Sequence, residues 1–511
     1  ATSKNAVAVD ARFILTDIAS THKATPPAKP FDSMPVVERF MPLFAPKSIA
    51  VLGASTKQST IANTFIRRMK AFGYPGNIYP VHPTADEIEG LKCYPSLAET
   101  PEPIYYAYIA IGAPRIPETL AGASGNVKFA QVISSGFGEV VGGRQLQKEL
   151  VEKAHAGGCR VIGPNCLGLY SPRGGVTFPV NAPKEVGAVG IVSQSGGLGT
   201  DIIKRGQWRG LRFSGLVTVG NSADLGPVDL FEFYMNDSQT KVIGLYVEDI
   251  KDGRRFFNLL RSGKASKPVV ILRGGTSTQG KAATASHTGA LSGGDRAWTA
   301  LSLQAGCVLV ETVDEFINAL LAFQFLKVRA TRPTQKVVLF GNGGGTSVLA
   351  TDFFASLGLD VLPFDDKTLK ALEAIEVPPG TSVVNPIDTP VATLQKEEGK
   401  IANRILDTVY TMASPDAVVM HLNLAAFVGR GDVDPIENIV KAAEKVQNDY
   451  PGQAHFVMAL RVDGSPELEE KMWEYRDRIL ARGIPVYDEL STAAKALKAV
   501  SWFERNLAMR G

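Results

Sequence analysis

A histidine in a run of small residues is the first candidate for chemistry in this sequence. The chain holds six histidines, and one of them, His287, lies between Lys281 and Gly294 in a segment made mostly of alanine, glycine, serine and threonine. Small neighbours leave an imidazole accessible and let its loop move, and a neutral imidazole is a good nucleophile near pH 7. Glu248, directly after the apolar run 245–247, is the candidate carboxylate that would fix the imidazole tautomer. The local residues alone favour the opposite interpretation, a histidine in a surface loop without a catalytic role.

A glycine-rich segment after an apolar strand could receive a phosphate group. Residues 193–199 follow the apolar run 190–192 and are expected to open a helix. The first turn of a helix presents free N–H groups and the positive end of a dipole, and two serine hydroxyls lie beside them here. A serine hydrolase is excluded because its nucleophile elbow needs a glycine two residues before Ser195, where Ser193 stands.

Two further glycine-rich segments come close to nucleotide-binding motifs without completing them. Residues 275–282 nearly match a P-loop, but Ala282 stands where a hydroxyl must reach Mg²⁺, which disfavours a P-loop nucleotide site. Residues 341–346 follow a strand and open a helix, but Thr346 replaces the third glycine of a dinucleotide fingerprint. That segment is equally compatible with close packing of a helix on a strand.

Three strand ends in the first third of the chain carry glycines with hydroxyl or amide side chains. They are residues 51–55, 133–139 and 163–168. Ligands of open α/β sheets bind at the carboxyl ends of strands, so these turns are candidates for contact with a phosphate or a pantetheine chain. The first turn has only Gly53, and an ordinary turn is as good an interpretation there. Cys166 has no histidine near it in sequence, so we interpret it as a packing residue.

The elements that must position these residues follow from the hydrophobic pattern. Near-continuous apolar runs alternate with segments of helical spacing, such as 61–72, which predicts parallel, doubly wound α/β sheets. Strands are expected over 48–53, 77–81, 105–111, 129–135, 160–165, 190–193, 215–219, 242–247, 268–272, 336–341, 416–420, 455–459 and 484–487. The pattern restarts twice, which predicts a Rossmann-like domain followed by two flavodoxin-like domains. The predicted boundaries are an N-terminal extension over 1–35 and domains over 36–180, 181–330 and 331–511.

The overall composition excludes several classes of protein. Hydrophobic residues make up 45% of the 511-residue chain and charged residues 21%, which supplies enough apolar material for a large core. The net charge is +3, without a dense Lys/Arg run, so nucleic acid is not expected as a partner. No apolar run approaches the ~20 residues of a membrane span, and no signal-peptide pattern is present. Four cysteines without CxxC spacing predict reduced thiols in a cytoplasmic protein.

Taken in order along the chain, these segments resemble one protein family. The sequence is similar to the alpha subunit of ADP-forming acetyl-CoA synthetases, and more distantly to that of succinyl-CoA synthetase, from about residue 36 to the C-terminus. The order of so many motifs is more specific than any one of them, and it makes His287 a strong candidate. The matching stretches are 51–55, 133–139, 163–168, 193–199, 246–256, 286–294, 343–349, 385–388 and 483–486.

The resemblance implies a role for each candidate residue. His287 falls on the histidine that carries a phosphoryl group, and Glu248 falls on the carboxylate paired with it. The residues that fall on the helix N-terminus stabilising the phosphohistidine are Ser195, Gly196 and Gly197. The residues that fall on the coenzyme A-binding edge are Gly53, Ser55, Ser134, Ser135, Gly136 and Asn165.

One departure from the family shapes the expected assembly. Family members need an ATP-grasp module, and none of the three expected domains resembles one. We therefore expect ATP/ADP and Mg²⁺ on a separate ATP-grasp beta subunit, in an α2β2 hetero-oligomer. The expected activity is that of an ADP-forming acid–CoA ligase, which makes acyl-CoA from a small carboxylic acid, CoA and ATP through phosphohistidine and acyl phosphate. Two alternatives stay open: an ATP-independent acyl or carbamoyl transferase on the same scaffold, and a non-catalytic CoA-binding module.

Overall fold

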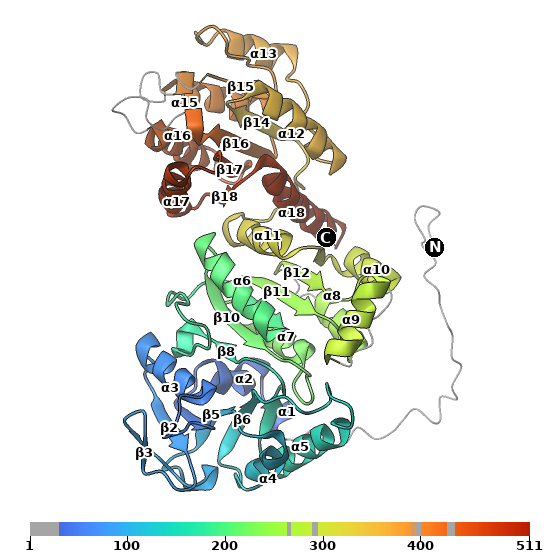
Figure 1. The fold of residues 1–511 in the computed structure, drawn as a ribbon. Coiled ribbons are helices and arrows are strands. Elements are labelled where there is room, and N and C mark those ends of the chain that lie inside the picture. The colour runs from blue at the N-terminus through green and yellow to red at the C-terminus, as the bar shows by residue number, and fades with distance from the viewer. Residues whose placement is uncertain are drawn as a thin grey trace, which may run out of the picture. The chain divides into compact units, whose positions relative to one another are not determined.

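The chain forms two compact units, each of which is described by itself. The computed structural model describes residues 30–262, 267–288, 295–390, 393–394, 400–426 and 435–510. The first unit comprises residues 1–207 and 212–309, and the second comprises 208–211 and 310–511. Figure 1 shows parallel sheets with helices packed against them throughout the described residues.

The first unit begins with a parallel sheet in the strand order β2-β1-β5-β6-β7. Its strands are β1 (Ser48–Leu52), β2 (Asn77–Val81), β5 (Ile104–Ile109), β6 (Val127–Val132) and β7 (Arg160–Ile162), with a small antiparallel pair, β3 (Glu87–Ile88) and β4 (Leu91–Lys92). The helices are α3 (Ile61–Phe72), α4 (Ile116–Ala121) and α5 (Arg144–Ala156). A capping box between Thr60 and Asn63 begins α3, and Gly73 ends it in the left-handed conformation.

A second sheet in the same unit has the order β13-β12-β11-β9-β10-β8. Its strands are β8 (Leu169–Tyr170), β9 (Val189–Ser193), β10 (Phe213–Thr218), β11 (Val242–Val247), β12 (Val269–Arg273) and β13 (Val308–Val310). The helices are α6 (Gly196–Trp208), α7 (Pro227–Asn236), α8 (Gly253–Arg261), α9 (Thr278–Thr288) and α10 (Asp295–Ala305). Strands β9 to β12 run parallel, whereas β8 is antiparallel to β10.

The second unit holds a parallel sheet in the order β15-β14-β16-β17-β18. Its strands are β14 (Val337–Gly341), β15 (Ile387–Asp388), β16 (Ala417–Asn423), β17 (His455–Arg461) and β18 (Val486–Tyr487). The helices are α11 (Val313–Phe325), α12 (Gly344–Ser356), α13 (Asp366–Glu373), α15 (Lys400–Thr408), α16 (Pro435–Asp449), α17 (Pro466–Leu480) and α18 (Leu490–Arg510). Helix α11 packs against α18, so it belongs to this unit.

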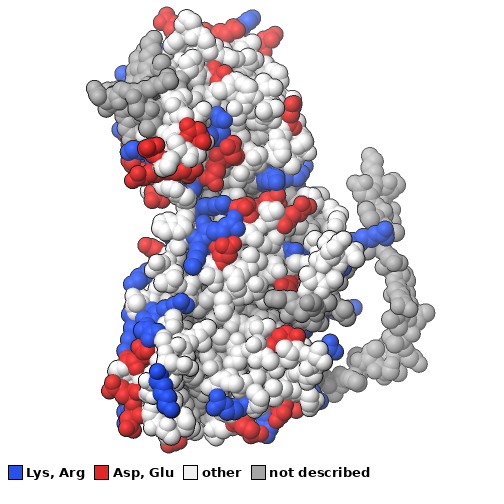
Figure 2. Space-filling model, in the orientation of Figure 1, with Lys and Arg blue, Asp and Glu red and all other residues white. Residues whose placement is uncertain are grey.

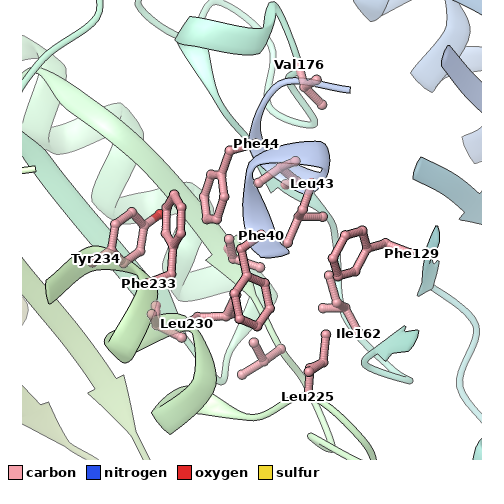
Figure 3. Close-up of a cluster of buried hydrophobic side chains, with 14 of the residues drawn as sticks. Phe40, Leu43, Phe44, Phe129, Ile162, Val176, Leu225, Leu230, Phe233 and Tyr234 are labelled. Carbon is pink, nitrogen blue, oxygen red and sulfur yellow. The ribbon is translucent and has the colours of Figure 1, made fainter. Parts of the chain in front are cut away.

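A short N-terminal helix joins the two sheets of the first unit through an aromatic core. After α1 (Pro30–Ser33), helix α2 (Val36–Phe44) carries Phe40 and Phe44 into the space between β6 and α7. The ring of Phe44 stacks on Phe233 of α7 with centroids 4.1 Å apart, and Phe40 stacks on Phe129 of β6 at 6.0 Å. Figure 3 shows these rings converging in one cluster. The two sheets of this unit are therefore held by a common hydrophobic core.

The predicted fold class is confirmed, because parallel sheets with strands at the expected positions make up both units. Strand β8 lies within the range predicted for the first domain but pairs with the second sheet. The predicted domain boundaries stay a prediction. Within the described residues, no helix combines the length and apolarity that a membrane crossing requires. Figure 2 shows acidic and basic side chains distributed over the visible face of both units, in keeping with the nearly balanced charge.

Candidate active site

The carboxyl ends of β9 and β11 form the centre of the candidate site. These strands are neighbours, and Ser193 lies beside Tyr246 in their register. The next residue after β9, Gln194, donates its backbone N–H to the carbonyl of Tyr246 at 3.1 Å. Its side-chain oxygen Oε1 accepts the backbone N–H groups of Glu248 and Asp249. The turn before α6 is thus tied directly to the residue that the sequence predicted as the catalytic carboxylate.

Glu248 is buried with one carboxylate oxygen bound and the other open. Glu248 is 6% exposed, and the hydroxyl of Tyr246 donates to its Oε1 at 3.0 Å. The other oxygen, Oε2, is buried and has no hydrogen-bond partner among the described residues. Buried polar atoms are almost always hydrogen-bonded, so an open acceptor here indicates that a donor arrives from another segment or from a ligand.

The absence of a side chain at Gly274 makes room for Tyr246 and Glu248. Gly274 follows β12, and a Cβ built there would lie 2.9 Å from the hydroxyl of Tyr246 and 3.1 Å from Cγ of Glu248. From Gly274 the chain turns into α9, whose first turn is capped by the Ser277 hydroxyl, which accepts the N–H of Gly280 at 2.9 Å. The segment that leads into α9, and along it to His287, therefore starts beside Glu248.

His287 is the penultimate residue of α9. The sequence predicted a loop at this position, and this expectation was wrong. Alanines at 282, 283 and 285 favour helix, which accounts for the continuation of α9 through Thr288. The side chain of His287 lies outside the described part of the structure, as do residues 289–294. Its pairing with Glu248 stays a prediction.

The helix predicted to bind phosphate begins where expected. The hydroxyl of Ser195 accepts the N–H of Leu198 at 3.3 Å, which caps the first turn of α6. Gly196 and Gly197 occupy that turn, where N–H groups have no acceptor within the helix. A Cβ on Gly197 would meet nothing within 4 Å, so the backbone is open on that side. Three residues predicted to face a phosphoryl group thus lie together at one helix end.

The turn after β7 packs against this helix end. A Cβ on Gly196 would lie 2.6 Å from Cγ of Leu167, so only glycine permits this approach. The backbone N–H groups of Leu167 and Gly168 donate to the Thr218 hydroxyl on β10, at 3.1 and 2.8 Å. Asn165, predicted on the CoA-binding edge, lies two residues before Leu167. The candidate CoA edge and the candidate phosphate helix are therefore adjacent within the first unit.

Two predicted CoA-edge residues lie in the turn between β1 and α3. Gly53 has φ +101°, and a Cβ there would lie 2.2 Å from the carbonyl oxygen of Ala110. This close approach requires glycine. The backbone N–H of Ser55 donates to the Asn63 side chain at 2.9 Å, and its hydroxyl accepts the N–H of Lys57 at 3.1 Å. Both residues build the turn.

The other predicted CoA-edge residues follow β6 and β7. The Ser134 hydroxyl donates to the carbonyl of Ile111, whereas Ser135 is exposed. The N–H of Gly136 donates to the Glu139 carboxylate, so one donor expected to face a phosphate is already occupied. Asn165 donates its backbone N–H to the carbonyl of Ser134 at 3.1 Å. The structure gathers these residues at one sheet edge, and their contacts with CoA stay a prediction.

Cys166 is a packing residue, as the sequence indicated. It is 4% exposed, and its thiol contacts Gln131 and the carbonyl of Val132. Burial raises the pKa of its thiol to about 12, so it stays protonated near neutral pH.

The sequence did not single out Gln194, Tyr246 or Gly274. One signal was available for Tyr246, because residues two apart on a strand point to the same face, and Tyr246 lies two before Glu248. The contacts of Gln194 and Gly274 join segments far apart in the chain and follow only from the folded structure.

Comparison with known proteins places these features in one family. A family described as "CoA binding domain" matches residues 47–172, and one described as "Succinyl-CoA ligase like flavodoxin domain" matches 186–323. The alpha subunits of ADP-forming acetate–CoA ligases II and I of Pyrococcus furiosus are 32% and 34% identical over 470 and 473 residues. Those alignments cover 91% and 90% of this chain and 98% and 96% of the relatives.

A solved structure agrees with the sequence relatives. The acetyl-coenzyme A synthetase 1 of Ca. Korarchaeum cryptofilum, in complex with phosphate and ADP, superposes with a TM-score of 0.77 at 29% identity. The match covers 92% of this chain and 98% of that one. This chain therefore belongs to the family of ADP-forming acid–CoA ligase alpha subunits. The predicted resemblance and the predicted class of enzyme, an ADP-forming acid–thiol ligase, are confirmed at the level of the family, and the matching domain supports CoA as a ligand.

Proposed function

We propose that this chain carries the phosphohistidine and the CoA site of a reversible ADP-forming acid–CoA ligase, with His287 as the phosphoryl carrier. The observation that carries the proposal is the open Oε2 of buried Glu248, beside the segment that leads through α9 to His287. A carboxylate oxygen there can accept the N–H of an imidazole and stabilise its positive form.

The reaction proceeds in three balanced steps. A nitrogen of His287 attacks the γ-phosphorus of ATP, an N–P bond forms, and the P–O bond to ADP breaks. A carboxylate oxygen of the acid then attacks the same phosphorus, which gives an acyl phosphate and returns the free imidazole. Finally the CoA thiolate attacks the acyl carbon and phosphate leaves, so that the net products are acyl-CoA, ADP and phosphate.

Residues of the first unit contribute to binding and orientation. The first-turn N–H groups of Gly196 and Gly197, with the α6 dipole, stabilise the negative phosphoryl oxygens. The contact of Leu167 with Gly196 brings the candidate CoA-binding edge to the start of α6, so that the thiol of CoA can reach the acyl phosphate.

The nucleotide is proposed to bind elsewhere. The residue that would complete a P-loop hydroxyl ligand is Ala282, which has no oxygen to offer Mg²⁺. We therefore assign ATP/ADP and Mg²⁺ to an ATP-grasp beta subunit in an α2β2 assembly. The Pyrococcus relatives are named as alpha subunits, which supports a partner chain. The substrate is proposed to be a small carboxylic acid, for which the names of those relatives supply acetate as the first candidate.

The experiment combines the purified chain with the candidate beta subunit, acetate, CoA and Mg·ATP, and measures acyl-CoA and ADP together. The proposal expects equal amounts of the two products and none when either subunit is omitted. Acyl-CoA formed by this chain without ATP would instead establish the transferase alternative. CoA binding without turnover for any acid, in the presence of the partner, would establish the binding-module alternative.

A further inference from the structure

The side-chain amide of Gln194 holds an unused hydrogen-bond donor at the candidate site. Gln194 is 7% exposed. Its Oε1 accepts the N–H groups of Glu248 and Asp249, the second at 3.1 Å, and two N–H donors require an oxygen rather than an NH₂ group opposite them. This fixes the orientation of the amide, so Nε2 occupies its other end. Among the described residues, Nε2 has no hydrogen-bond acceptor.

The side chain of Gln194 is held nearly buried by its oxygen, while its amide nitrogen has no acceptor within the described part of the chain and is free to donate to a ligand. Gln194 directly precedes Ser195, which caps α6, and the next two residues contribute the open first-turn N–H groups. The residue that holds the open amide donor therefore comes directly before the open N–H groups at the N-terminus of a 13-residue helix. Such a cluster fits an anion with several oxygens, as a phosphoryl group has.

The hydrogen bond from Glu248 to Gln194 ties together the two residues that hold the open donor and the open acceptor. The amide oxygen fixes the backbone of Glu248, whose Oε2 is the open acceptor of the site. In a phosphohistidine the imidazole N–H needs an acceptor and the phosphoryl oxygens need donors. The two open groups, Glu248 Oε2 and Gln194 Nε2, match these two needs.

We infer that Gln194 is a further catalytic residue, whose Nε2 donates a hydrogen bond to a phosphoryl oxygen during transfer to and from His287. The inference rests on the proposed function. As the N–P bond forms and the P–O bond to ADP breaks, negative charge is spread over the phosphoryl oxygens, and a preorganised neutral donor stabilises that charge. The role differs from that of a tether, because a tether uses only the amide oxygen.

Two substitutions separate the donor from the tether. Gln194→Glu keeps an oxygen that accepts both backbone N–H groups, but replaces the donor with a second oxygen. Gln194→Met is similar in size and removes both functions. Gln207→Glu is the matched control, because it makes the same change in the last turn of α6, about 16 Å along the axis from the first residue of that helix.

The measurement is the rate at which labelled phosphate from [γ-³²P]ATP is incorporated into the chain with its beta subunit and Mg²⁺, together with Tm. For Gln194→Glu we expect a Tm close to that of the unmodified chain and a rate lower by about 10²–10³-fold. The rate should recover in part as the pH falls, because a protonated carboxyl can donate again, and the unmodified chain should show no such recovery. Gln207→Glu should label at the unmodified rate.

The results separate this inference from the proposed function. If the unmodified chain takes up no label, the proposed function fails. If it is labelled and Gln194→Glu is labelled equally fast while Gln194→Met is impaired, Gln194 is only a tether and this inference alone is overturned. If Gln194→Glu does not fold, NMR of the chain without substitutions tests the inference instead. The resonance of the ¹⁵N-labelled side-chain amide of Gln194 should shift when the chain is phosphorylated, and an unchanged resonance overturns the inference.

Discussion

Tyr246 and Glu248 lie two residues apart at the end of β11, and the tyrosine hydroxyl donates to Oε1 of the glutamate at 3.0 Å. Burial and the neighbouring carboxylate raise the pKa of Tyr246 well above its ordinary value, so the phenol remains a donor at working pH. One carboxylate oxygen is thereby fixed, and the other stays open for the imidazole that we propose as its partner. Under that proposal Tyr246 would act on His287 only through Glu248, which would make it a positioning residue.

Tyr246→Phe should slow phosphorylation of the chain about 10- to 100-fold, because a hydrogen bond to a charged group is worth about 1.5–3 kcal/mol. The measurement is incorporation of label from ATP in the presence of the partner. Tyr170→Phe is the control, since that hydroxyl donates to the carbonyl of Pro183 at 2.6 Å and plays no part in the site. Equal rates for the two variants would contradict a positioning role for Tyr246.

Gly196→Ala should impair both folding and phosphorylation, because its Cβ would lie 2.6 Å from Cγ of Leu167. Overpacking of this kind costs about 1–3 kcal/mol. Gly197→Ala is the matched control and should leave Tm unchanged, since nothing lies within 4 Å of the added carbon. Combining Gly196→Ala with Leu167→Ala should restore part of the loss, and a double variant no better than Gly196→Ala would exclude this contact as the cause.

Asp224 should make the first unit sensitive to acid. Burial opposes its charge, but the imidazole of His155, 3.1 Å away, and the hydrogen bonds from Arg160 overcome this and hold the pKa of Asp224 at about 2. Its unfolded value is about 3.9, so the charged form stabilises the folded state above pH ~4 by about 2 kcal/mol, and this stabilisation is lost as the pH falls towards 2. Urea midpoints for the unmodified chain and Asp224→Asn should differ at pH 6 and converge near pH 2. A difference that does not change with pH would contradict the shift.

Phe44→Ala should destabilise the first unit by about 3–5 kcal/mol, the usual cost of truncating a buried phenylalanine. Phe44 is 0% exposed and stacks on Phe233, so the loss leaves a cavity between the two sheets. Val141→Ala removes an exposed apolar side chain and should change the free energy of unfolding by less than about 0.5 kcal/mol. Similar urea midpoints for the two variants would show that the cluster in Figure 3 does not hold the unit together.

Much of the fold could be predicted from local sequence. The helix expected over 61–72 has those bounds in the structure, because Thr60, Asn63 and Gly73 mark its ends chemically. Buried strands such as β11 and β14 were expected because their residues are apolar without a break. Strand β8 was not expected, since two residues leave no periodic signal.

The site was predictable only in part. Glu248 and the start of α6 follow from strand ends and helix starts, which are local features. The role of Gln194 depends on hydrogen bonds to residues 54 and 55 positions away, and the need for glycine at 196 depends on Leu167. Such contacts arise when separate strands pair, so one sequence read along its length does not reveal them.

The central claim is that His287 carries the phosphoryl group. The most direct measurement mixes the chain with its ATP-grasp partner, Mg²⁺ and [γ-³²P]ATP, then maps the label by proteolysis and mass spectrometry under alkaline conditions. We predict an acid-labile, base-stable phosphate on the peptide that contains His287, and none in His287→Ala. A phosphate that persists in His287→Ala, or an unmodified chain that is never labelled although acyl-CoA and ADP are formed, would contradict the account.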